Sequence, residues 1–186
     1  MTAQTLRDRC PDDRMKTLLA GKGGKQLAEL DDALRDWPDD PRLHFLKGSL
    51  LAGRQDYTGA RLAMRRAIDL APDFRLARFQ LGLLLLTSAE PIAAQEVWGP
   101  LQTLPPDHYL RIFADGLCRL IRDDFAGAAD TLRSGLSRNN EIPAMNRDMQ
   151  LVIDEISRKL DEGTVGQPQS SVDLLLQQAA LKANRP

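Results

Sequence analysis

The chain has 186 residues, of which 42% are hydrophobic, enough for one globular domain with a buried core. Its 25 Lys and Arg residues nearly balance its 26 Asp and Glu residues, so the formal net charge is −1. This balance argues against a general nucleic-acid or membrane-surface binder, which would have an excess of basic residues. Ordinary numbers of glycine and proline exclude collagen-like and wholly disordered chains.

Cysteine and histidine are scarce. Cys10 and Cys118 form no CxxC motif, and His44 and His108 are the only histidines. We therefore expect no metal site, no other cofactor and a reducing compartment. The N-terminal segment lacks the apolar core of a secretory signal, and the longest apolar run, residues 81–86, is too short to cross a bilayer. We expect a cytoplasmic protein without a membrane partner.

The first predicted elements are two helices near residues 12–20 and 24–36. A glycine-rich segment, residues 20–26, separates them and superficially resembles a phosphate-binding loop. Its glycines are too closely spaced for that motif, and Gln26 stands where a hydroxyl residue is needed to bind Mg²⁺. The segment is therefore predicted to be a turn.

A 34-residue period runs through the middle of the chain and defines units 41–74, 75–108 and 109–142. In the first unit, apolar residues recur at helical spacing over 43–52, and a second helix is expected over 57–70, ended by Pro72. Small residues in both helices favour a closely packed hairpin. The positions that keep the period are Gly48, Gly82 and Gly116; Ala60, Ala94 and Ala128; and Pro38, Pro72 and Pro106.

The clearest unit, KGSLLAGRQDYTGARLAMRRAIDLAP at residues 47–72, resembles the tetratricopeptide repeat. It matches the family at six positions: Gly48, Asp56, Tyr57, Ala60, Ala67 and Pro72. The units are degenerate elsewhere, because the family's tryptophan is replaced by His44, Arg78 and Ile112, and Ala67 has Leu101 and Gly135 as its equivalents. The resemblance implies an all-α fold, a right-handed superhelical solenoid of antiparallel helix hairpins that binds peptides in a concave groove.

The flanking segments extend this prediction. Residues 12–38 place Ala33 and Pro38 in phase with the repeat and are interpreted as a degenerate N-terminal repeat. Apolar residues at helical spacing predict a capping helix over 143–160, which would complete a solenoid over 1–160. A linker over 161–171 and a C-terminal amphipathic helix over 172–184 are expected to follow.

The predicted binding site is an apolar stripe on the first helix of each unit. In tetratricopeptide repeat proteins the equivalent positions line the peptide groove, and here they lack the basic and asparagine residues that clamp a C-terminal carboxylate. The alternative is that the stripe is ordinary hairpin core. The groove residues of this prediction are Phe45, Ser49, Phe79, Leu83, Leu86, Phe113, Leu117 and Leu120.

A second candidate site is basic. Residues 41–80 hold eight basic and three acidic residues, a local net charge of +5 within a chain of −1. This segment is either a solvated face or a patch that attracts an acidic partner segment. The arginines of the predicted patch are Arg61, Arg65, Arg66, Arg75 and Arg78.

These patterns predict a non-catalytic adaptor or scaffold that binds a protein or peptide partner. A small tetratricopeptide chaperone of a secretion or assembly system is the alternative, and it would copurify with one unstable client. An enzyme has no supporting nucleophile-and-base pattern, and we expect no nucleic-acid partner.

The C-terminal helix is predicted to cover the apolar groove, either in its own chain or in a second copy as a homodimer contact. Its apolar residues are Val172, Leu174, Leu175, Leu176 and Leu181. Deleting residues 164–186 should therefore expose apolar surface, raise the binding of a hydrophobic dye and lower solubility or change the oligomeric state. Dye binding, solubility and size-exclusion behaviour identical to those of the full chain would contradict this prediction.

Overall fold

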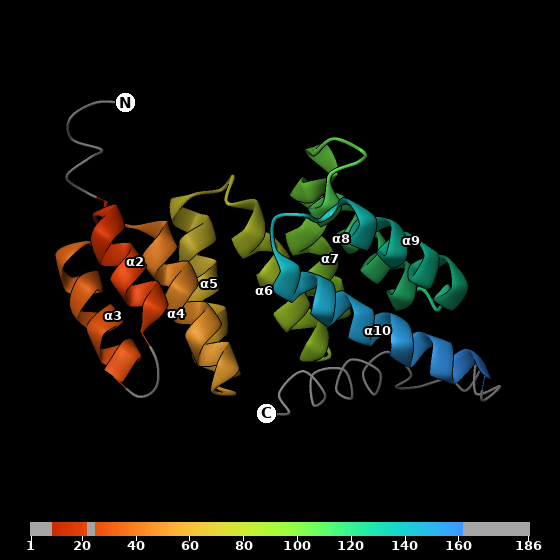
Figure 1. Ribbon diagram of the computed structural model, residues 1–186, viewed down its shortest axis with the longest axis horizontal. Coiled ribbons are helices and arrows are strands. Elements are labelled where there is room, and N and C mark those ends of the chain that lie inside the picture. Colours follow the sequence, from red (N-terminus) through yellow and green to blue (C-terminus); the bar gives the residue numbers. More distant parts are fainter. Residues whose placement is uncertain (1–8, 22–24, 162–186) are drawn as a thin grey trace. The chain divides into compact units, whose positions relative to one another are not determined.

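The computed structural model describes residues 9–21 and 25–161, and their regular structure is entirely helical, which confirms the all-α class (Figure 1). The predicted helix over 172–184 and all but the first residue of the predicted linker lie outside these residues. The elements are α2 (Asp12–Ala20), α3 (Lys25–Asp36), α4 (Pro41–Gly53), α5 (Tyr57–Leu70), α6 (Arg75–Thr87), α7 (Pro91–Trp98), the 3₁₀ helix η1 (Gly99–Thr103), α8 (Tyr109–Ile121), α9 (Phe125–Arg138) and α10 (Pro143–Asp161).

The chain divides into two compact units. Unit 1 extends to Leu81 and unit 2 begins at Gly82, so the boundary falls inside α6 and not between two of the predicted repeats. In unit 1, residues of α2, α3 and α4 share one apolar core, which also includes Cys10. In unit 2, α8 packs against α9, and α10 packs against α9.

The 34-residue period is visible in the backbone. Helices α4, α6 and α8 begin at residues 41, 75 and 109, and α5, α7 and α9 begin at residues 57, 91 and 125. Each hairpin turns through one residue with a positive φ, at Gln55, Ala89 and Asp123, again 34 residues apart. The next backbone N–H, that of Asp56, Glu90 or Asp124, donates to a carbonyl of the first helix over 2.9, 3.0 and 3.1 Å. The three turns therefore share one backbone conformation.

The glycine of each first helix lies against a large side chain of the second helix. A Cβ added at Gly82 would lie 2.1 Å from Nε1 of Trp98. At Gly48 and Gly116 it would lie 2.6 Å from Met64 and 2.8 Å from Leu132. The three covering side chains, Met64, Trp98 and Leu132, are themselves 34 residues apart. Glycine is required here because any side chain would collide with the opposite helix.

The start of each second helix differs among the hairpins. The carboxylates of Asp56 and Asp124 cap α5 and α9 by accepting from the N–H groups of Gly59 and Gly127. A Cβ at Gly59 would lie 2.6 Å from the capping carboxylate, which explains the glycine at that position. In the middle hairpin Glu90 precedes the helix, Ala93 replaces the glycine, and Glu90 makes no side-chain cap.

Helix α7 is the one that departs most from the repeat. It ends at Trp98, and the chain continues as η1 because Pro100 has no N–H to donate to the carbonyl of Glu96. The side chain of Gln102 donates to Asp115, and that of Arg111 donates to the carbonyl of Leu104, which ties this segment to α8.

Helix α10 begins where a fourth unit would begin and covers the segment in which the capping helix is expected. Met145, Met149, Val152, Ile153 and Ile156 are buried, as their helical spacing suggests. Buried Asn139 shapes the approach to α10: its carbonyl oxygen Oδ1 accepts from the N–H groups of Glu141 and Ile142, and its amide donates to Asn146.

A matched pair of glycine substitutions tests the helix contact. Gly82→Ala should lower the free energy of unfolding by about 2 kcal/mol, because the new methyl group collides with the Trp98 indole. Gly53→Ala is the control, since Gly53 lies at the exposed end of α4 with nothing within 4 Å of an added Cβ, and it should be neutral or stabilise by less than about 1 kcal/mol. Denaturant midpoints measure both, and equal effects would show that the close contact is unimportant.

Candidate protein-interaction surface

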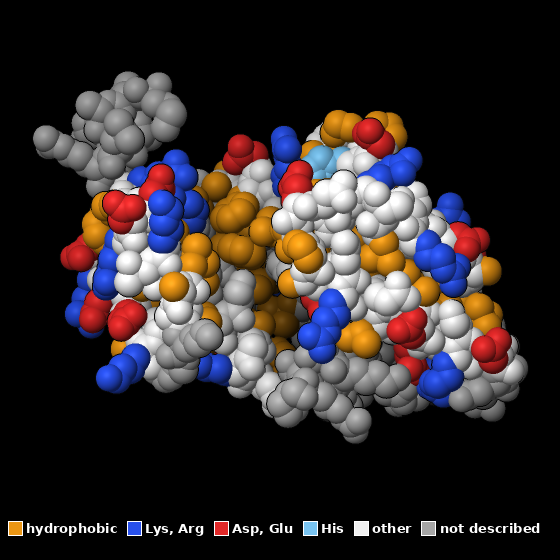
Figure 2. Space-filling view, viewed as in Figure 1, with side chains coloured by type: hydrophobic (Ala, Val, Ile, Leu, Met, Phe, Trp, Pro, Cys, Tyr) orange, Lys and Arg blue, Asp and Glu red, His pale blue; other side chains and the backbone are white. Residues whose placement is uncertain are grey.

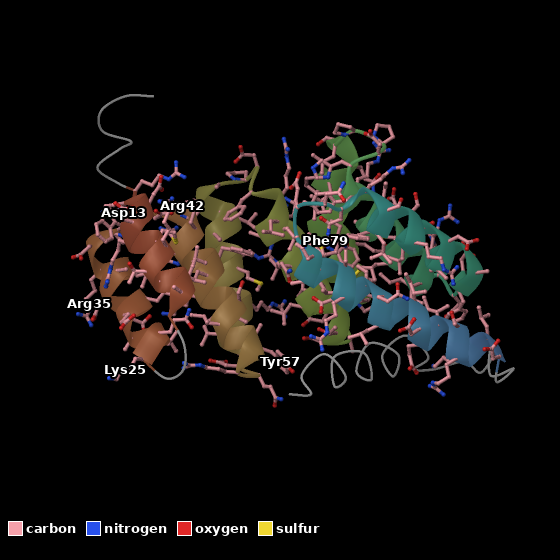
Figure 3. All side chains as sticks on the ribbon, in the orientation of Figure 1. Asp13, Lys25, Arg35, Arg42, Tyr57 and Phe79 are labelled. Carbon is pink, nitrogen blue, oxygen red and sulfur yellow. The ribbon has the colours of Figure 1, made fainter. Side chains whose placement is uncertain are left out.

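The predicted apolar stripe divides into buried and accessible parts. Phe79, Leu86, Phe113, Leu117 and Leu120 are fully buried, so in this structure they are core side chains and present no surface to a ligand. Figure 3 labels Phe79 on α6. The interpretation of the stripe as hairpin core therefore describes these five better than an open groove does.

Phe113 shows why the stripe is closed in α8. A Cβ added at Gly135 would lie 2.4 Å from Cε1 of Phe113, so the ring occupies the space that the glycine of α9 leaves open. The ring of Tyr109 lies edge-on to it, with centroids 6.1 Å apart. Phe113 thus fills the interface between α8 and α9.

The accessible part of the stripe lies on α4 and α6. Phe45 and Leu83 are partly exposed, and Ser49 is exposed. The Phe45 ring packs against Phe74 with centroids 5.1 Å apart, and the Ser49 hydroxyl donates to the carbonyl of Phe45. Only these three of the eight predicted groove residues offer contact to a partner.

The predicted basic patch is accessible. Arg65, Arg66 and Arg75 are exposed, and Arg61 and Arg78 are partly exposed. Arg66 pairs with Asp39 over 2.7 Å, and Arg78 donates to the carbonyl of Pro72 over 2.8 Å. Burial, together with the positive charge of Arg65, lowers the pKa of Arg78.

Leu62, which is not among the predicted site residues, lies among these arginines and is 69% exposed. The signal was available, since Leu62 is three and four residues from Arg65 and Arg66 and therefore shares their helix face. By contrast, the face of unit 1 shown in Figure 2 has acidic and basic side chains side by side. Exposed ion pairs of unit 1 include Lys16–Asp13 and Arg35–Asp32.

One cluster of buried charge also lies in unit 1. The carboxylate of Asp40 accepts from the N–H of Cys10 over 2.8 Å and from two nitrogens of the Arg42 guanidinium. Arg42 also donates to the carbonyl of Cys10 and to Asp12, at the N-terminal end of α2 (Figure 3). Asp40 and Arg42 therefore bind the backbone N–H and the backbone carbonyl of Cys10. Their role is to stabilise the fold.

The hydrogen bonds and burial in this cluster explain the pKa shifts of Asp40 and Cys10. Burial acts to raise the pKa of Asp40, but the hydrogen bonds from Arg42 and Cys10 outweigh it, and the net pKa lies below its ordinary value of 3.8. Burial and the nearby Asp40 raise the pKa of the Cys10 thiol, which keeps it protonated and a poor nucleophile.

A comparable structural contact joins α8 to the segment before α10. The Tyr109 hydroxyl donates to Glu141 over 3.0 Å, and burial together with this hydrogen bond raises the pKa of Tyr109 to about 12. His108 caps α8 by accepting from the N–H of Leu110 through Nδ1. These contacts do not place His108 or Tyr109 next to a nucleophile.

Comparison with models of known protein families gives no match, and comparison with curated proteins gives no significant relative. The tetratricopeptide resemblance therefore rests on the repeat residues. Among the residues that the structure describes, no three His, Cys, Asp or Glu side chains gather to hold a metal ion. None of the helices between residues 9 and 161 that are described has the length and apolar character needed to span a membrane.

Replacing Asp40 tests the buried pair. Asp40→Asn should lower the free energy of unfolding by about 3 kcal/mol at neutral pH, because Arg42 loses its buried charged partner and keeps only the exposed Asp12. Because the pKa of Asp40 is lower in the folded chain, the contribution of its charge is complete above pH 3.8 and is lost as the pH falls through the folded-state value. The wild type should therefore lose more stability in acid than Asp40→Asn does.

The matched control is Asp32→Asn, which breaks the pair with Arg35 on the surface of α3, where the side chains are 58% and 77% exposed. It should change the free energy of unfolding by less than about 0.5 kcal/mol. Urea denaturation between about pH 3 and pH 7 measures both variants. Equal losses in the two variants, or parallel acid profiles for wild type and Asp40→Asn, would contradict the assignment.

Proposed function

We propose that this protein is a non-catalytic, cytoplasmic adaptor of the tetratricopeptide type that binds a protein or peptide partner. The observation that supports the proposal most is the repeated hairpin. Its turn residues, its interhelical glycines and the side chains that cover them all recur at the 34-residue period. Stacked helical repeats form extended surfaces that bind partners.

The roles of the buried ionisable groups support the same proposal. Asp40 and Arg42 hold the backbone of residue 10, and Tyr109 joins Glu141. These four side chains each connect two segments of the chain, and burial raises the pKa of the partly exposed thiol of Cys118. The surface proposed for recognition consists of the accessible apolar and basic side chains on α4, α5 and the start of α6.

The partner contact is proposed to involve unit 1 more than the closed stripe of α8. Phe45 and Ser49 remain accessible on α4, and the arginines with Leu62 are accessible on α5. In α8 the corresponding positions, Phe113 and Leu117, are occupied in the hairpin interior. A partner that needs an apolar contact therefore finds it on α4 or α5 without any rearrangement of the hairpins.

Site-specific photo-crosslinking in cells tests the proposal. A photoreactive residue is introduced at exposed Ser49 on α4 and, separately, at exposed Thr58 on α5. At least one position should yield a defined adduct, and the purified partner should form a stoichiometric complex with the chain at micromolar affinity or better, about −8 kcal/mol. Neither this chain nor the partner should be chemically modified when the complex forms.

The control position is Ser137 on α9, an exposed serine whose hydroxyl donates to a helix carbonyl as that of Ser49 does. Adducts no stronger at Ser49 and Thr58 than at Ser137 would contradict an adaptor function. A partner that is soluble only in the presence of this chain would instead identify a chaperone.

A further inference from the structure

The first and third hairpins differ at one pair of equivalent positions on the second helix. In α9, Arg133 pairs with Asp130 three residues earlier over 2.9 Å. The equivalent residues in α5, each 68 positions earlier, are Arg65 and Leu62. The chain thus keeps the arginine of the pair in both hairpins, but in α5 it replaces the acidic residue with an exposed leucine.

This replacement leaves Arg65 without a carboxylate partner among the described residues, whereas Arg133 has one within its own helix. Further positive charge surrounds Arg65. Arg61 lies one turn before Arg65 on α5, Arg66 follows Arg65, and burial together with the positive charge of Arg65 lowers the pKa of Arg78 on α6. Arg75 precedes Arg78 by one helical turn. Arg66 pairs with Asp39 over 2.7 Å.

We infer that the arginine face of α5, formed by Arg61, Leu62, Arg65 and Arg66 together with Arg75 and Arg78, docks an acidic peptide segment that contains an apolar side chain. The inference rests on the proposed adaptor function and names its surface and the chemistry of the partner. Carboxylates of the segment replace the missing partner of Arg65 and relieve the repulsion from Arg78. The apolar side chain covers Leu62, the most exposed large apolar residue among those of unit 1 that the structure describes.

The size and charge of the face favour a short peptide over a nucleic acid. Helix α5 has 14 residues and spans about 21 Å, which about seven residues of extended peptide can cover. Outside residues 41–80 the chain has a net charge of −6, so a long polyanion extending past the face would be repelled. An exposed leucine at the centre of the face also has no favourable role against a phosphate backbone.

The test uses the full chain and a fluorescent probe peptide about ten residues long, composed of Glu and Asp with one central leucine, acetylated and amidated so that its only charges are side-chain carboxylates. Fluorescence anisotropy at about 50 mM salt should show saturable binding that weakens at about 300 mM salt. Arg65→Glu should weaken binding by about tenfold or more, since an attractive charge becomes repulsive. Asp69→Asn should strengthen it, because Asp69 is exposed one turn beyond Arg65 on α5.

The matched control for charge is Arg133→Glu, which makes the same change at the equivalent repeat position and should alter the affinity by less than about twofold. For the apolar contact, Leu62→Ser should weaken binding, and Ile92→Ser should not, although Ile92 is 74% exposed on α7. Circular dichroism and thermal melting establish that each variant is folded.

Four results would overturn the inference: no binding of the peptide by the wild type, equal losses for Arg65→Glu and Arg133→Glu, equal losses for Leu62→Ser and Ile92→Ser, or tighter binding of a single-stranded RNA of the same charge. If Arg65→Glu does not change the affinity for a partner identified by crosslinking, the arginine face is not the docking surface, but the adaptor function still stands. Absence of any crosslinked partner would instead contradict the adaptor function itself.

Discussion

The architecture depends on how closely the two helices of each hairpin approach. At Gly48, Gly82 and Gly116 the opposite side chain occupies the space in which a Cβ would stand. The covering residue varies from methionine to tryptophan to leucine, but the glycine does not change, because only its lack of a side chain permits the contact. The turn must then reverse the chain within a few residues. It does so through one left-handed residue and one hydrogen bond back to the first helix, both repeated in every hairpin.

The middle hairpin keeps this glycine contact but differs from the other two in its helix cap, in the length of its second helix and in the contacts that stabilise it. It lacks the aspartate cap, since Glu90 and Ala93 replace the Asp and Gly of the other two, and Pro100 shortens its second helix. Loss of a cap and of helical hydrogen bonds costs about 1 kcal/mol or more. Contacts from η1 to α8 through Gln102 and Arg111, and the burial of the large indole of Trp98, act in the opposite direction.

The elements were predictable from sequence because their signals are local. Proline, aspartate and glycine at the ends of helices place α5 at residues 57–70, and Asp40 followed by Pro41 explains why α4 begins two residues before its first apolar position. The candidate site was less predictable, because burial depends on what lies opposite. Phe45 and Phe113 share one repeat position, yet the ring of Phe113 fills the space left by Gly135, whereas the equivalent of Gly135 in the first hairpin is Ala67. Likewise, the contact of Asp40 and Arg42 with Cys10 joins residues about thirty positions apart, for which no local pattern exists.

Repetition within one chain also allows each hairpin to serve as a reference for the others. Where the backbone and the interhelical glycine are the same, a difference in exposed side chains is not required by the fold and reflects what that hairpin presents to solvent. The pair Asp130–Arg133 is an example of an arginine whose charge is neutralised by an acidic residue of the same helix. The departure at Leu62 and Arg65 supports the proposed docking surface, because an apolar side chain is exposed at the position of the acid and Arg65 has no acidic residue at the position that Asp130 has relative to Arg133. Within the segment of local charge +5, Arg42, Lys47 and Arg66 pair with Asp40, Asp31 and Asp39, so Arg65 differs from these three in having no carboxylate partner among the described residues.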